Sequence, residues 1–128
     1  MATPEDLDLT TGKVHGVPVA RLEGEVDKLA VEQARAHLDP LAATGRLVID
    51  LDRVSFIDSA GLHALFGLGR VATAAGGGLA LSVPASCAVA RVVEIVRLSD
   101  AMPVRESVED AAAALAALSE VLPIDADG

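Results

Sequence analysis

The sequence predicts an α/β fold: a single domain with a mixed, mostly parallel β-sheet of about four to five strands and four helices. Short segments that are apolar, or in which apolar and polar residues alternate, are typical of strands. Between them lie longer segments in which apolar residues recur every three or four positions, as in helices. The segment Arg46–Leu51 is apolar on both faces, as expected of a central strand that is covered on both sides. The glycines at 76–78 stop one helical segment directly before the next strand.

The chain begins with two segments that we expect to form an antiparallel hairpin at one edge of the sheet. Leu7–Thr11 and Val14–Leu22 have the pattern of strands, and the turn between them falls at Gly12-Lys13 or at Gly16. Pro18 indicates that the start of the second strand lies on an edge or outside the hydrogen-bonded ladder.

Two helices are expected next, one before and one after the strand Arg46–Leu51 in the chain. A loop at Gly24–Asp27 leads into the first helix, Leu29–Ala43, which Pro40 should end or bend. The second helix runs from Ser59 to about Ala75.

The apolar periodicity of the second helix distinguishes its two sides. At about 100° per residue, Leu62 and Leu65 share the side that packs on the sheet. His63 and Gly67 share the opposite side, which we expect to face outward, with Phe66 at its border.

The second half of the chain repeats the alternation and ends in a helix that opens with a capping box at Ser107. The residues outside the domain are polar and acidic, which predicts flexible ends. The expected elements are a strand Leu79–Val83, a helix Pro84–Leu98, a strand Val104–Glu106 and a helix to about Leu118, and the expected divisions are a flexible N-terminus at 1–6, the domain at 7–120 and a flexible acidic tail at 121–128.

Composition excludes several classes of partner and location. Ten Lys and Arg against nineteen Asp and Glu give a formal net charge of −9, which argues against binding to nucleic acid or directly to an anionic membrane. The N-terminus lacks the basic flank and apolar core of a secretory signal, and the single Cys87 fits a reducing compartment. These features predict a cytoplasmic protein.

Catalysis and metal binding have little support in the residues. Ser59 as a hydrolase nucleophile would need Gly at position 57, where Ile57 stands. No His, Asp and Glu have the spacing of metal ligands, and we expect no cofactor. Asp50 and Asp52 could suggest a phospho-acceptor pocket, but solvated loop charge is the preferred interpretation.

Ser59 has two possible roles at the start of the second helix. The first N–H groups of a helix lack partners within it, so a short oxygen-bearing side chain can cap them. The same N–H groups and the helix dipole would also tolerate a phosphate on the Ser59 hydroxyl. Asp27 could cap the first helix in the same way.

Two motifs resemble those of the STAS domain, and within it those of the bacterial anti-sigma factor antagonists. They are Gly24-Glu25-Val26-Asp27 and Val54-Ser55-Phe56-Ile57-Asp58-Ser59-Ala60-Gly61-Leu62, and the likeness extends over roughly Leu7–Leu118. Ala60 and His63 depart from the pattern, since Ser or Thr and Gly are common there.

The resemblance implies a partner-switching protein without catalytic activity. Its partner would be an ATP-binding anti-sigma factor that is also a Ser/Thr kinase; the kinase would phosphorylate Ser59, and a Ser/Thr phosphatase would reverse this. Two alternatives stay open: a STAS binding subunit of a lipid-transport ATPase or stress-signalling complex that is never phosphorylated, and a small serine hydrolase. The residues expected to contact the partner are Glu25, Asp27, Asp58, Gly61, Leu62, His63 and Phe66.

Overall fold

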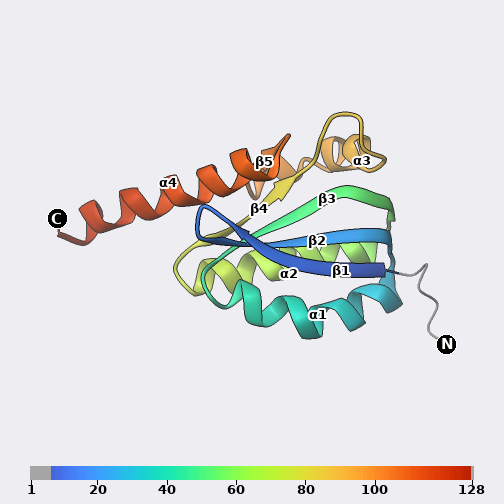
Figure 1. Ribbon diagram of the computed structural model, residues 1–128, viewed down its shortest axis with the longest axis horizontal. Helices are drawn as coiled ribbons and strands as arrows, with labels where there is room; N and C mark the ends of the chain where they lie inside the picture. Colours follow the sequence, from blue (N-terminus) through green and yellow to red (C-terminus); the bar gives the residue numbers. More distant parts are fainter. Residues whose placement is uncertain (1–6, 128) are drawn as a thin grey trace.

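The computed structural model describes residues 7–127, with side chains for residues 7–117 (Figure 1). Residues 1–6 and Gly128, parts of the two predicted flexible ends, lie outside the described residues. The elements in chain order are β1 (Leu7–Val14), β2 (Val17–Val26), α1 (Lys28–Ala42), β3 (Arg46–Ile57), α2 (Ser59–Ala74), β4 (Gly78–Ser82), α3 (Ala90–Ile95), the 3₁₀ helix η1 (Leu98–Asp100), β5 (Val104–Arg105) and α4 (Val108–Asp127).

The strands of the described residues form one sheet in the order β1-β2-β3-β4-β5. β1 pairs with β2 antiparallel, and the other neighbours pair in parallel. Helices α1 and α2 pack against one face, while α4 crosses the opposite face (Figure 1). The predicted fold class, a mixed and mostly parallel sheet in an α/β domain with four α-helices, is confirmed.

The hairpin turn lies at His15-Gly16, one of the two predicted positions. Both residues have positive φ, 53° and 77°, which matches a two-residue turn whose twist fits the flanking strands. Val14 therefore ends β1 and pairs with Val17, instead of starting the second strand as predicted. Pro18 precedes the part of β2 that pairs with β3, which begins at Val19.

β2 and β3 continue further than their sequence patterns indicate. The predicted loop at Gly24–Asp27 is strand as far as Val26, and β3 runs to Ile57 instead of ending at Leu51. Two register shifts interrupt the pairing of these strands, and such irregularities break the alternation of apolar and polar residues. The extension brings the ends of both strands to the same edge of the sheet.

Asp50 is not a solvated loop residue as predicted. It lies in the middle of β3, only 3% exposed. Its Oδ2 accepts a hydrogen bond from Arg21 Nε at 2.8 Å, and its Oδ1 accepts one from the Asp52 backbone N–H at 3.1 Å. Arg21 lies opposite it on β2, so the cation reaches the carboxylate while keeping contact with water.

Replacing Arg21 by methionine should lower the free energy of unfolding by about 1 to 3 kcal/mol. The change leaves the buried Asp50 carboxylate with only the Asp52 N–H as partner, and an unpaired buried charge is costly. Urea denaturation of both proteins measures the difference. Arg53→Met removes an exposed arginine without an ion pair among the described residues and should stay within about 0.5 kcal/mol of the parent. Equal midpoints for both variants would contradict the prediction.

The helices differ from their predicted bounds mainly at their ends. α1 continues through Pro40 and ends two residues later, at Ala42. α3 covers only Ala90–Ile95 of the predicted 84–98, and α4 continues past Leu118 to Asp127. Flexibility at 121–128 stays a prediction.

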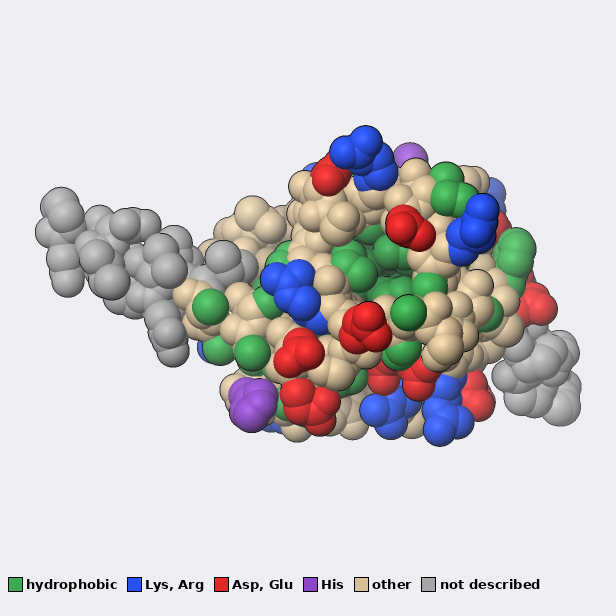
Figure 2. Space-filling view, turned by 90° about the horizontal axis from the view of Figure 1, so that it is seen from above, with side chains coloured by type: hydrophobic (Ala, Val, Ile, Leu, Met, Phe, Trp, Pro, Cys, Tyr) green, Lys and Arg blue, Asp and Glu red, His purple; other side chains and the backbone are tan. Residues whose placement is uncertain are grey.

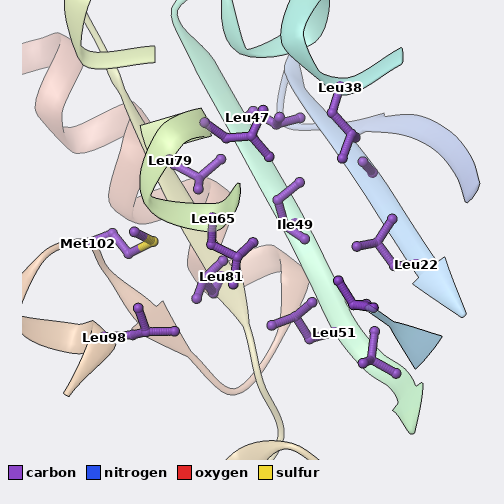
Figure 3. Packing of buried hydrophobic residues seen from close by; sticks show 14 of the residues in the cluster. Leu22, Leu38, Leu47, Ile49, Leu51, Leu65, Leu79, Leu81, Leu98 and Met102 are labelled. Atoms are coloured by element: carbon purple, nitrogen blue, oxygen red, sulfur yellow. The ribbon is translucent and has the colours of Figure 1, made fainter. Parts of the chain in front are cut away.

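Aliphatic side chains from both helices and strands fill the space between α1, α2 and the sheet. Every second residue at the start of β3 points into this core, namely Leu47, Ile49 and Leu51 (Figure 3). Leu65 of α2 packs in the same core. A smaller cluster under α4 includes Val48. Because the core fixes α2 against β3, it also fixes the position of the α2 start.

Candidate partner-binding site

Two helices, α1 and α2, begin side by side at the edge of the sheet that is formed by the carboxyl ends of β2 and β3. Val26 and Ile57, the last residues of β2 and β3, lie opposite each other in the parallel ladder. The next residue of each chain segment is an aspartate that caps the following helix. Asp27 accepts a hydrogen bond from the Ala30 N–H at 2.9 Å, which confirms its predicted cap role, and Asp58 accepts one from the Gly61 N–H at 2.9 Å.

Ser59 is the first residue of α2, and its side chain is exposed. Because Asp58 provides the cap, the interpretation of Ser59 as the capping residue is wrong. The side-chain hydrogen bonds between described residues include none to the Ser59 hydroxyl, and the backbone N–H groups of Ser59 and Ala60 also have no partner there. This hydroxyl is therefore accessible beside unused backbone donors.

Gly61 is the residue that allows α2 to start so close to β2. It is buried, and a Cβ at this position would lie 2.6 Å from the Val26 carbonyl oxygen and 2.7 Å from Ile57 Cγ1. Real Cβ atoms do not come this close to a backbone oxygen. Gly61 thus serves the site by positioning the first turn of α2. Because it is buried, it is not accessible to a partner.

The other predicted contact residues divide into groups. Glu25 is exposed on β2 beside the strand ends, close in the chain to Asp27. His63 is exposed on the side of α2 that faces α1. Leu62 is half-buried, and Phe66, also half-buried, lies on the opposite side of α2 in a hollow that Met102 helps to line. The structure gathers the acidic residues and Ser59 at one edge and places Phe66 further along the helix.

Two exposed apolar side chains next to this edge were not predicted as contacts. Phe56 is 48% exposed and pairs with Glu25 across the strands, and Leu29, 59% exposed, lies in the first turn of α1. Exposed aromatic and large aliphatic side chains are typical anchors of protein interfaces. The signal for Phe56 was available in its place beside the buried Ile57, since strand neighbours point to opposite faces.

The described residues contain no group of three or more His, Cys, Asp or Glu that could hold a metal ion. Within residues 7–127, none of the helices combines the length and the apolar character needed to cross a membrane. The groups present at this edge are an accessible hydroxyl, free backbone donors, carboxylates and apolar side chains.

Comparisons with known proteins match this architecture. The family model of the STAS domain matches residues 9–111. The chain is 34% identical over 110 residues to BtrV of Bordetella bronchiseptica, named as an anti-sigma factor antagonist, with 84% of this chain and 94% of that protein covered.

Solved structures agree with this match. An anti-sigma factor antagonist from Mycobacterium paratuberculosis, at 24% identity and a TM-score of 0.71, shares the fold over 90% of this chain and 98% of its own. The Bacillus cell fate determinant SpoIIAA in its phosphorylated form is 27% identical with a TM-score of 0.58, and 81% of this chain and 96% of that chain are covered. SpoIIAA in its unphosphorylated form, described as an anti-sigma factor antagonist, is 25% identical with a TM-score of 0.63, and 82% of this chain and 94% of that chain are covered. The chain belongs to the STAS domain family and, within it, to the anti-sigma factor antagonists.

Proposed function

We propose that this chain binds an ATP-binding anti-sigma factor through the edge around Ser59, and that phosphorylation of Ser59 by that partner releases it. The observation that supports the proposal best is the accessible Ser59 hydroxyl at the start of α2, where Asp58 supplies the cap. The similar protein SpoIIAA, of which both a phosphorylated and an unphosphorylated structure exist, supports a switch of this kind.

The proposed contact surface consists of exposed or half-exposed residues around this hydroxyl, together with Phe66 further along α2. Gly61 is not a contact residue of this surface; it positions α2. The apolar side chains of Phe56 and Leu29 add the desolvated contacts that usually dominate binding energy. The full surface is Leu29, Phe56 and Ser59 with the predicted Glu25, Asp27, Asp58, Leu62, His63 and Phe66.

The protein acts by binding, in this proposal, and carries out no chemistry of its own. A serine nucleophile needs a base within hydrogen-bond reach, and the bonds between described residues supply none to Ser59. The site of action is the cytoplasm, where sigma factors meet RNA polymerase. A phosphatase would return the protein to its binding form.

Incubation with the anti-sigma factor kinase and ATP-Mg²⁺ should give a single species about 80 Da heavier, because a hydroxyl gains one phosphate. Intact-mass spectrometry measures the shift, and fragmentation places it. Ser59→Ala should abolish it, while Ser55→Ala, which removes another exposed hydroxyl of the same strand-to-helix segment, should leave it unchanged. A phosphate on another residue, or none with a kinase that binds the protein, would refute the proposed regulation.

A further inference from the structure

A groove runs between α1 and α2, starting beside Ser59 and continuing along both helices. Its volume is about 680 Å³. Small residues of α2 form one wall, with Ala60 at the end next to Ser59 and Ala74 at the other. The residues that line it are Lys28, Val31, Glu32, Arg35, Ala60, His63, Ala64, Gly67, Arg70, Val71 and Ala74.

The groove is unlike the rest of this acidic chain in its charge. Three of the ten Lys and Arg residues line it, together with one of the nineteen Asp and Glu residues. Lys28 and Arg70 form no ion pair with a described residue. Arg35 donates from Nε to Asp39 Oδ1 at 2.6 Å, so part of its charge is already compensated. Lys28 and Arg70 are therefore the cations available to a partner.

Gly67 fixes the position of the third cation. It was predicted to face outward, but it is buried beneath the Arg35 guanidinium, and a Cβ there would lie 2.8 Å from an Arg35 terminal nitrogen. The absent side chain lets the guanidinium of α1 lie directly on α2. Cations from two helices consequently face the same groove.

The face of the molecule seen in Figure 2 offers a contrast. There, above α3 and α4, Lys and Arg side chains are interspersed with Asp and Glu around a hollow with apolar side chains. Interspersed charges give no net attraction for one sign of partner charge. The groove between α1 and α2 has an excess of cations, and it therefore attracts a negatively charged partner segment.

We infer that this groove receives an acidic segment of the anti-sigma factor, beside the surface around Ser59. The inference rests on the proposed function, because it assigns part of the same partner to a second contact. A phosphate on Ser59, carrying about −1.5 to −2 charges, stands at the groove end where Lys28 and His63 lie, and it lowers the attraction for that segment. Phosphorylation thus acts on the groove as well as at the hydroxyl.

Reversing one groove charge tests the inference. Arg70→Glu should raise the Kd for the anti-sigma factor at least tenfold at 50 mM NaCl, and the effect should shrink at 300 mM because salt screens charge pairs. Arg91→Glu makes the same charge change on the exposed surface of α3 and should alter Kd less than twofold. Isothermal titration calorimetry with the unphosphorylated full-length proteins gives the values, and thermal unfolding checks that both variants fold.

The outcomes separate the inference from the proposed function. If the parent protein binds the anti-sigma factor and both variants bind it with the same Kd, the groove is not a contact. The inference then fails while the proposed function stands. If the parent protein does not bind, the proposed function fails. A loss confined to Arg70→Glu, strongest at low salt, supports the groove as the docking site.

Discussion

Phosphorylation of Ser59 is expected to weaken binding to the anti-sigma factor by roughly a hundredfold or more, with the fold unchanged. The phosphate adds about −1.5 to −2 charges to a protein already at −9 and beside Asp27 and Asp58. A loss of about 3 kcal/mol at an interface corresponds to a factor of roughly one hundred to two hundred in Kd. Within the protein, the unused N–H groups at the start of α2 and the helix dipole accommodate the anion, so the melting temperature should barely move.

Calorimetric titration of the two forms measures the change in affinity. Ser59→Glu, which carries one charge, should have an intermediate effect, and Ser59→Ala should bind like the parent. Ser99→Glu is the matched control, because it adds the same charge to an exposed serine of η1. Tight binding by the phosphorylated form would show that the switch lies elsewhere.

Gly61→Ala is expected to destabilise the protein by about 1 to 3 kcal/mol and to weaken partner binding at the same time. The added Cβ would lie 2.6 Å from the Val26 carbonyl oxygen, and backbone cannot move away as a flexible side chain could. α2 must shift outward, which moves Ser59 and the Asp58 cap relative to the end of β2. Urea denaturation and titration with the anti-sigma factor measure the two effects.

Gly12→Ala provides the control for this change. Gly12 lies in β1 with no atom within 4 Å of an added Cβ, so alanine there should leave stability within about 0.5 kcal/mol of the parent or raise it slightly. If Gly61→Ala is equally harmless, the close approach of α2 to β2 is not a requirement of the fold.

The regular parts of the fold could be predicted because local patterns determine them. The apolar run at the start of β3 and the periodicity of α2 both correspond to elements found in the structure. The helix cap at Asp27 also follows from local chemistry, since aspartate before a helical segment is a strong N-terminal signal. Likeness to the STAS motifs added the expectation of a switch at Ser59.

The features that depend on contacts between distant segments could not be predicted. Asp50 looked like a loop charge because its partner, Arg21, is 29 residues away and reaches it only through the pairing of β2 with β3. The groove depends on Arg35 lying over Gly67, a contact between two helices whose relative position is set by the core. The cap role of Asp58 in place of Ser59 is visible only in the geometry of the first turn of α2.

The composition of the core has a consequence for spectroscopy. The chain has no Trp or Tyr, and its two Phe residues, Phe56 and Phe66, both stay partly exposed within the proposed contact surface. Fluorophenylalanine incorporated in place of phenylalanine would therefore give a ¹⁹F spectrum of two resonances, one from the end of β3 and one from α2. Such a spectrum observes partner binding at two places in the proposed contact surface, the end of β3 and the side of α2 where Phe66 lies.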